Sequence, residues 1–147
     1  MCPTVIASYS KLRPLLSLTY YPYYKGCIKG KDISVIRYNK DIIQNHVCVF
    51  EGFMDFLSYQ ELHRKGDHHI CIDNPTDFLV MNSVSNLKKC LVELERYTVI
   101  HCYLDNDLAG RKTVETIAGL CGNRVTDHSE CYYNYKDLND YLRGKRR

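Results

Sequence analysis

Two aspartates separated by a single residue are the side chains of this sequence best suited to chemistry. Asp105 and Asp107 follow an apolar run, 98–102, and precede a helix-like pattern, so we expect them where a buried strand ends and a helix begins. Carboxylates spaced i, i+2 at the end of a strand point the same way. Two like charges about 4 Å apart repel by roughly 4 kcal/mol at an effective dielectric of about 20. Such a pair favours a divalent cation, and the small step Ala109–Gly110 lets another group approach the turn closely.

Two further acidic segments accompany this pair. Glu51 ends the apolar run 47–50 and is followed directly by Gly52. Another acid, Asp55, lies four residues after Glu51. A charge at the end of such a strand needs a partner or a chemical role, because burying it unpaired is costly. The third segment, 136–142, contains Asp137, Asn139 and Asp140.

The order of these segments resembles that of the Toprim family, the catalytic domain shared by bacterial primases, type IA and type II topoisomerases and some nucleases. The resemblance rests on a strand followed by Glu-Gly, a strand followed by Asp-x-Asp-x-Ala-Gly, and a late Lys-Asp-x-x-Asp segment, and it covers about residues 47–143. The forms at 51–55 and 109–110 look most like the bacterial primase branch, which includes compact primase-type proteins of mobile elements.

The resemblance implies roles for the acidic residues. Asp105 and Asp107 correspond to the family's Mg²⁺ ligands, and Mg²⁺ prefers few carboxylates together with waters that substrate phosphates can replace. Glu51 corresponds to the glutamate that serves as a metal ligand or as a general acid/base in phosphoryl transfer. Asp137 corresponds to the third acidic motif and completes the expected metal-binding set. The resemblance thus implies the catalytic residues Glu51, Asp105 and Asp107, with Mg²⁺ as the cofactor and Mn²⁺ as its alternative.

Three positions are candidates for supporting this set. Asp55 either points back to the cluster or is a first-turn acid favoured by the helix dipole. Asn139 stands where the family often has a second acid, and a neutral amide binds a cation more weakly than a carboxylate does. Asp140 could compensate, or the chain could use a single metal ion.

Basic residues are concentrated at the start of the chain. The first 46 residues carry seven Lys and Arg against two Asp, a net charge of +5, whereas residues 47–147 carry a net charge of −2. A basic segment joined to an acidic body suits a metal-dependent nucleic-acid enzyme, because one part attracts phosphate and the other holds cations. Lys25, Lys31 and Arg111 are the candidates for contact with phosphate or nucleotide, and ordinary surface side chains are the alternative.

Bulk composition limits the class of protein. A chain of 147 residues is expected to form one domain with a sizeable core. It has no apolar stretch of the roughly 18 residues that a membrane span needs and no signal-peptide pattern, which favours a cytoplasmic protein, and the family resemblance implies a bacterial one. The eight cysteines contain no Cys-x-x-Cys pair, so we expect reduced thiols and no zinc.

From residue 47 onward, short apolar runs alternate with helical patterns. The alternation predicts an α/β fold, here a Toprim-like, mostly parallel four-stranded sheet covered by helices, with ligands at the carboxyl ends of the strands. We divide the chain into a small, basic, β-rich N-terminal subdomain (1–46), a catalytic domain (47–143) and a basic tail (144–147) that is expected to fray. The expected strands are 15–24, 32–37, 47–50, 78–81, 98–104 and 124–126, with a short extended piece at 69–72, and the expected helices are 54–65, 86–96, 108–120 and 138–143.

The resemblance and the residues together favour a primase-type domain that carries out Mg²⁺-dependent nucleotidyl transfer on single-stranded DNA. Its expected partners are the template and nucleoside triphosphates, with a helicase or another replication protein as a further partner and no membrane. Two alternatives stay open: a metal-dependent nuclease, in which the same cluster activates water, and a non-catalytic nucleic-acid-binding fragment of a longer primase. A topoisomerase is disfavoured, because 147 residues leave no room for a strand gate.

Overall fold

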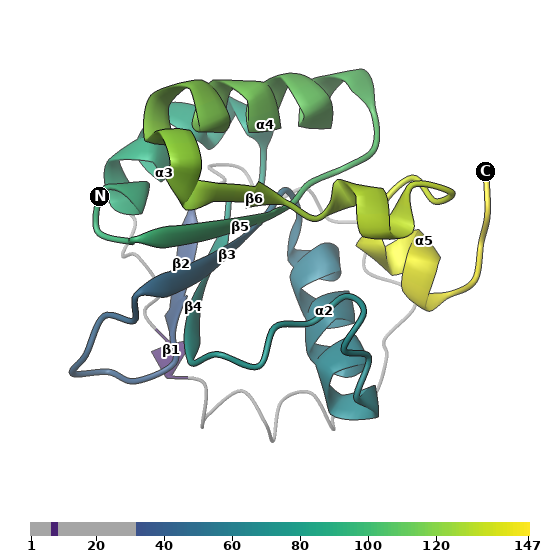
Figure 1. Ribbon diagram of the computed structural model, residues 1–147, viewed down its shortest axis with the longest axis horizontal. Helices are drawn as coiled ribbons and strands as arrows, with labels where there is room; N and C mark the ends of the chain where they lie inside the picture. The colour runs from purple at the N-terminus through teal and green to yellow at the C-terminus, as the bar shows by residue number, and fades with distance from the viewer. Residues whose placement is uncertain (1–6, 9–31) are drawn as a thin grey trace.

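A computed structural model describes residues 7–8 and 32–147, and its strands form one mixed sheet (Figure 1). The strands are β1 (Ala7–Ser8), β2 (Ser34–Arg37), β3 (His46–Phe50), β4 (Thr76–Val80), β5 (Val99–Tyr103) and β6 (Val125–Asp127). They lie in the order β1-β2-β4-β3-β5-β6. β3 is parallel to both of its neighbours, β4 and β5, and β6 is parallel to β5, whereas β2 is antiparallel to β4.

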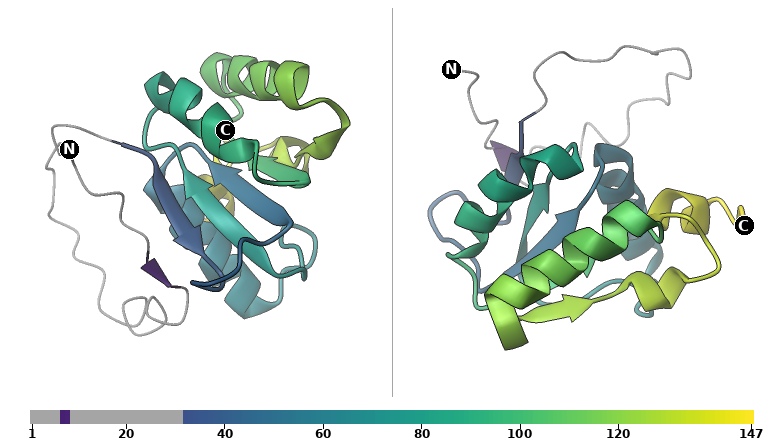
Figure 2. Two further views of the ribbon diagram at one scale, coloured as in Figure 1. Left: turned by 90° about the vertical axis from the view of Figure 1, so that its left-hand side faces the viewer. Right: turned by 90° about the horizontal axis from the view of Figure 1, so that it is seen from above.

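Helices cover both faces of this sheet (Figure 2). They are α2 (Phe53–Lys65), α3 (Leu87–Leu94), α4 (Leu108–Cys121) and α5 (Leu138–Leu142), with short 3-10 turns η1 (Val84–Asn86), η2 (Gly122–Arg124) and η3 (Ser129–Tyr132). α2 and α5 pack on one face, and α3 and α4 pack on the other. None of the helices in the described part of the chain is both long and apolar enough to cross a membrane.

Alternation of side chains along each strand produces a separate core on each face. In β3, Cys48 and Phe50 point to the α2 face, whereas Val47 and Val49 point to the face covered by α3 and α4. All four are fully buried, and burying such side chains contributes about 1.5–3 kcal/mol for each of the larger ones. A strand covered on both faces favours apolar side chains on both, which explains the uninterrupted run 47–50 in the sequence.

The α/β fold expected from the sequence is confirmed. The four runs expected as strands between residues 47 and 126 are β3, β4, β5 and β6, and the four expected helices are α2 to α5. The strand expected at 32–37 is β2, which with β1 extends the sheet beyond four strands. The strand expected at 15–24 lies outside the described residues, and the domain boundary at residue 46 stays a prediction.

The segment 69–72 differs from its expected extended form, because a turn stabilises it. The carbonyl of Asp67 accepts the N–H group of Cys71 at 2.9 Å, and the Asp67 carboxylate accepts the N–H group of His69 at 3.2 Å. These hydrogen bonds curl the chain immediately after α2. An aspartate side chain that competes for backbone donors thus overrides the apolar pattern of this short segment.

The basic tail 144–147 is also more ordered than expected. The N–H group of Lys145 donates to the carbonyl of Asp140 at 2.9 Å, and that of Arg147 donates to the carbonyl of Asn134 at 3.1 Å. Gly144, with φ +67°, supplies the left-handed turn that lets the chain leave α5 in this direction. The tail is therefore folded back onto the segment that precedes α5.

Candidate metal centre

The acidic residues come from four segments that meet at the carboxyl ends of β3 and β5. Glu51 follows β3 directly, and Asp105 lies two residues after the end of β5. Because β3 and β5 are adjacent parallel strands, both residues lie at the same edge of the sheet. Asp55 comes from the first turn of α2, and Asp137 is the residue that caps α5.

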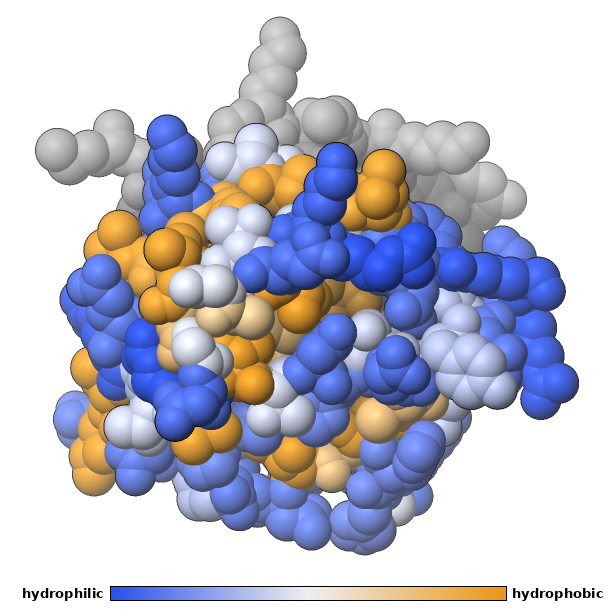
Figure 3. Space-filling model, turned by 45° about the horizontal axis from the view of Figure 1, so that its top comes forward, coloured by the Kyte–Doolittle hydropathy of each residue, from blue (hydrophilic) through white to orange (hydrophobic). Residues whose placement is uncertain are grey.

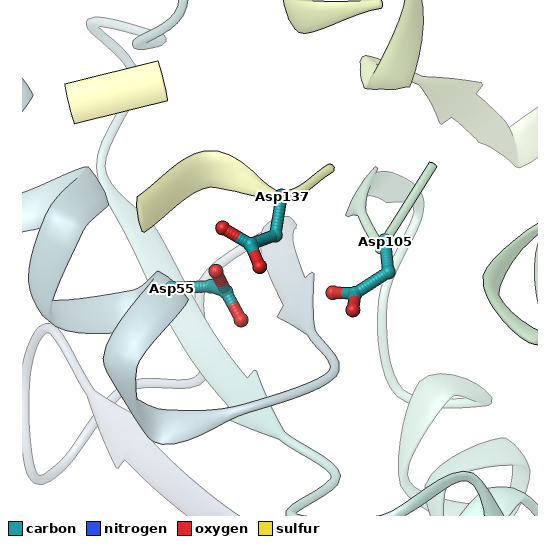
Figure 4. A group of neighbouring side chains, drawn as sticks. All are labelled: Asp55, Asp105 and Asp137. Atoms are coloured by element: carbon teal, nitrogen blue, oxygen red, sulfur yellow. The ribbon is translucent and has the colours of Figure 1, made fainter. Parts of the chain in front are cut away.

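Three of these carboxylates point toward one another (Figure 4). Asp55, Asp105 and Asp137 each place a carboxylate oxygen within 4.8 Å of the other two. From the sequence alone, Asp105 and Asp137 are expected in the metal-binding set and Asp55 only among the supporting residues. α2 begins immediately after Gly52, so its first turn lies close to the ends of the strands. Asp55, in that turn, therefore reaches the cluster.

Asp107 has a second, structural role beyond the one we expected. It is the N-cap of α4, and its Oδ1 accepts the N–H group of Gly110 at 2.9 Å. N-capping fixes a side chain at the helix end. The charge of Asp107 is still close enough to raise the pKa of Glu51. Asp107 therefore contributes to the electrostatics of the site and stays a proposed metal ligand.

Glu51 lies half-buried beside the three aspartates. Burial, together with the charges of Asp105 and Asp107, raises the pKa of Glu51 to about 7. Its Oε2 is buried and finds no hydrogen-bond partner among the described residues. A buried oxygen left without a partner is costly, so this atom suits a bound cation or proton.

The same effects act on the aspartates. Burial raises the pKa of Asp55 to about 7, and the charges of Asp105 and Asp137 add to the rise. Burial also raises the pKa of Asp105, although Lys136 opposes that change. Crowded carboxylate oxygens that repel one another have the composition of a divalent metal site, because a cation would replace repulsion with attraction. The residues present therefore fit Mg²⁺ or Mn²⁺.

Lys136 belongs to the site, although the sequence pattern does not predict it. Its Nζ lies 3.5 Å from Asp105 and 3.8 Å from Asp137. The charge of Asp105, followed by that of Asp137, raises the pKa of Lys136. Its place next to Asp137 was the signal available in the sequence, but adjacency alone did not show that the ammonium reaches Asp105 as well.

Asn106, between the two aspartates of the motif, connects the turn 104–107 to the C-terminal segment. Its Nδ2 group donates to three backbone carbonyls of the segment 129–135 at 3.1–3.2 Å, and its N–H group donates to the carbonyl of Lys136 at 2.7 Å. Asn106 is only 8% exposed, so these bonds are shielded from water. Sequence reasoning missed this residue because its partners lie far away along the chain.

We expected another group to approach Ala109–Gly110 closely, and that group is the backbone of Asp105. A Cβ added at Gly110 would lie 2.0 Å from the carbonyl oxygen of Asp105. Carbon and oxygen atoms cannot approach so closely, so only glycine lets α4 begin directly against the turn that carries Asp105.

Asn139 and Asp140 support the site through their backbone. The N–H group of Asn139 donates to Oδ1 of Asp55 at 3.3 Å, and that of Asp140 donates to Oδ1 of Asp137 at 2.7 Å. The Asn139 side chain is engaged elsewhere, since its Oδ1 accepts the hydroxyl of Ser58 at 3.4 Å. In the described part of the chain, neither side chain joins the cluster of three aspartates.

Of the three basic candidates, Arg111 alone lies among the described residues. Arg111 is exposed in the first turn of α4, next to Gly110, which lies against the turn that carries Asp105. Lys25 and Lys31 lie outside the described residues. Their proposed contact with phosphate or nucleotide therefore stays a prediction.

Comparison with known proteins identifies the family. The chain matches the Toprim-like family over residues 48–142, which is more than half of its length, and it belongs to that family. Among solved structures, the primase fragment of the bacteriophage T7 primase-helicase protein is similar, with 27% sequence identity and a TM-score of 0.49 over 70% of this chain. The chain covers 40% of that fragment. No curated protein matches it.

Proposed function

We propose that this Toprim-like chain transfers nucleotides in an Mg²⁺-dependent reaction on single-stranded DNA, as a DNA primase does. The observation that carries the proposal is the convergence of Asp55, Asp105 and Asp137 beside Glu51 at the carboxyl ends of the parallel strands β3 and β5. The primase type is inferred from the residues of the segments 51–55 and 109–110, which resemble those of the bacterial primase branch. The substrates would be a single-stranded template and nucleoside triphosphates, and a helicase or another replication protein is a proposed further partner.

Asp55, Asp105 and Asp137 would hold the cation, with Glu51 and Asp107 as further proposed ligands. A bound Mg²⁺ supplies positive charge that stabilises phosphate oxygens during transfer. The remaining chemistry belongs to side chains of this protein. Their arrangement on the rigid ends of two strands and two helices keeps them in position before substrate arrives.

Glu51 is the residue best placed to move a proton. Without a cation, burial and the charges of Asp105 and Asp107 raise the pKa of Glu51 to about 7, and a bound cation would lower it and keep the carboxylate ionised as a proton acceptor. In the proposed reaction, Glu51 takes the proton of the attacking 3′-hydroxyl while the hydroxyl oxygen forms a bond to the α-phosphorus of the nucleoside triphosphate and pyrophosphate leaves. The Lys136 ammonium, beside Asp105, would stabilise negative charge on the phosphate, because its raised pKa keeps it protonated.

The test is primer synthesis on single-stranded DNA with labelled nucleotides and Mg²⁺ or Mn²⁺. We expect short, metal-dependent products from the wild-type chain and none from Asp105→Asn. The matched control is Asp41→Asn, which changes an exposed aspartate outside the cluster and should leave the products intact.

Three other results would contradict the proposal. Metal-dependent shortening of the template, lost in Asp105→Asn, would make the chain a nuclease. Binding of DNA without any product would make it a non-catalytic module. Equal product yields from the wild type and Asp105→Asn would remove the acidic cluster from the chemistry.

A further inference from the structure

The last five residues of the chain carry four basic side chains, Arg143, Lys145, Arg146 and Arg147. All four are exposed, and within the described residues none of them forms a salt bridge with a carboxylate. This differs from Lys136, whose ammonium is engaged by Asp105 and Asp137. We call the segment 143–147 the basic arm.

Backbone hydrogen bonds hold the basic arm in one conformation. The N–H groups of Arg143 and Gly144 donate to carbonyls of α5 at 3.1 and 3.0 Å. Those of Lys145 and Arg147 donate to the carbonyls of Asp140 and Asn134. The side chain of Arg146 is further held by the hydroxyl of Tyr135 at 3.5 Å. A binding segment that is already ordered loses little conformational entropy when a ligand arrives.

The basic arm ends against the turn 104–107. The guanidinium of Arg147 donates to the backbone carbonyl of Asn106, the residue between Asp105 and Asp107. The arm therefore lies at the rim of the acidic cluster and is connected to it directly. Hydrophilic side chains project from the right-hand side in Figure 3, the side on which Figure 1 places the C-terminus.

We propose that the basic arm binds the phosphate backbone of the single-stranded nucleic acid that enters the acidic cluster. This inference rests on the proposed function. Four exposed cations without carboxylate partners among the described residues, spread over five consecutive residues, match the repeated charges of a strand, whereas a free nucleoside triphosphate presents its phosphates as one compact group. Asp55, Asp105 and Asp137 repel a polyanion, so a cationic rim beside them is needed to keep a strand close to the site.

The test compares two triple variants in binding to a labelled single-stranded oligonucleotide. One is Arg143→Gln/Lys145→Gln/Arg146→Gln, which leaves the contact between Arg147 and the turn intact. The control is Lys65→Gln/Lys88→Gln/Arg96→Gln, which removes the same charge from exposed residues elsewhere. Both are measured by fluorescence anisotropy in EDTA between about 50 and 200 mM salt, so that no catalysis contributes to the signal.

We expect the arm variant to bind about tenfold to a hundredfold more weakly at low salt. The slope of log Kd against log salt should fall by about 2, since each phosphate contact on a single strand contributes about 0.7. The control should change affinity by less than about threefold and keep the slope, because only a general charge effect remains. Thermal unfolding of both variants should match the wild type.

Equal weakening of binding by the two variants would overturn the inference, because charge and not position would then matter. A raised Kd for nucleoside triphosphate in the arm variant, with DNA binding unchanged, would also overturn it and assign the arm to the nucleotide. The two proposals fail separately. Primer synthesis with an unaffected salt slope rejects only the arm, and an arm-dependent slope without primer synthesis rejects only the catalytic function.

Discussion

The carboxylates of the candidate metal centre oppose folding when no cation balances them. Asp55 shows this effect clearly, because burial and neighbouring charges raise its pKa to about 7 from an ordinary value of 3.8. Between pH 3.8 and about pH 7, the Asp55 carboxyl binds its proton more tightly in the folded state than in the unfolded state. Stability is therefore lost as pH rises through about 7. The same residue that would bind metal destabilises the protein at neutral and alkaline pH.

Replacing Asp55 with asparagine should separate these two effects. At pH 8 without divalent cations, we expect Asp55→Asn to raise the free energy of unfolding by about 1–3 kcal/mol, since a neutral amide escapes the repulsion. The gain should shrink as pH falls toward 4. Addition of Mg²⁺ should stabilise the wild type more than the variant. Urea unfolding provides the measurement, with Asp41→Asn as the exposed control.

A loss of stability in Asp55→Asn at pH 8 would show that the repulsion is not the dominant effect at this position. An equal response of wild type and variant to Mg²⁺ would show that Asp55 does not contribute to cation binding.

At the scale of elements, the connection between β5 and α4 depends on the absence of a side chain at Gly110. We expect Gly110→Ala to lower the free energy of unfolding by about 2 kcal/mol or more and to abolish metal binding, because its Cβ would displace the carbonyl of Asp105. Gly119 lies in the same helix with nothing near its Cβ position. Gly119→Ala should therefore stabilise the helix by about 0.5–1 kcal/mol. Thermal unfolding of both variants tests the contrast, which fails if the two changes have effects of the same sign.

Three histidines from separate segments form a hydrogen-bonded chain across the sheet. His101 contacts His46 and His128 through its two ring nitrogens, at 3.0 Å each. Burial, followed by the nearby charges of His128 and His46, lowers the pKa of His101 to about 4. The unfolded state then binds the proton more tightly, so stability should fall as pH drops from about 6.5 toward 4.

We expect His101→Gln to reduce this pH dependence. Between pH 7 and pH 4.5 the wild type should lose about 2 kcal/mol more stability than the variant, as judged by urea unfolding. Taking the difference removes the opposite contribution of the acidic cluster, which is common to both proteins. Parallel curves would mean that His101 is not held neutral by the fold.

The sequence predicts local elements of this protein better than contacts between them. Buried parallel strands have to be apolar on both faces, so β3 and β5 stand out, and Asp105 is placed by the strand that precedes it. Lys136, Asn106 and the histidine chain could not be predicted, because each acts through partners that only the fold brings near. Asp107 and Asn139 were expected by type, but the helix caps and backbone contacts that engage them depend on where each helix begins.

At the scale of the whole molecule, β2 is joined to the Toprim-like region by a buried ion pair. Arg37 donates to Asp77 in β4 at 2.9 Å, and Asp77 is fully buried. A second link, between Lys89 and Asp32 at 2.9 Å, lies at the surface. The two links span the same boundary at residue 46 in very different environments.

These two links should differ greatly in strength. We expect Arg37→Met to lower the free energy of unfolding by about 3–5 kcal/mol, because it leaves the buried carboxylate of Asp77 without its counter-charge. Lys89→Met should change it by no more than about 1 kcal/mol, since exposed pairs are screened by water. Chemical denaturation of both variants tests this. A small effect of Arg37→Met would mean that β2 is only loosely attached and that the boundary at residue 46 separates independent parts.

Calorimetric titration of the wild type and Asp105→Asn with Mn²⁺ and Mg²⁺ tests the proposed metal centre most directly. We expect saturable binding to the wild type and to Asp41→Asn, and at least tenfold weaker binding to Asp105→Asn, because Asp105 is the carboxylate shared by the cluster and the Asp-x-Asp motif. Equal affinity in all three proteins, or no binding to the wild type, would contradict a metal centre at this position.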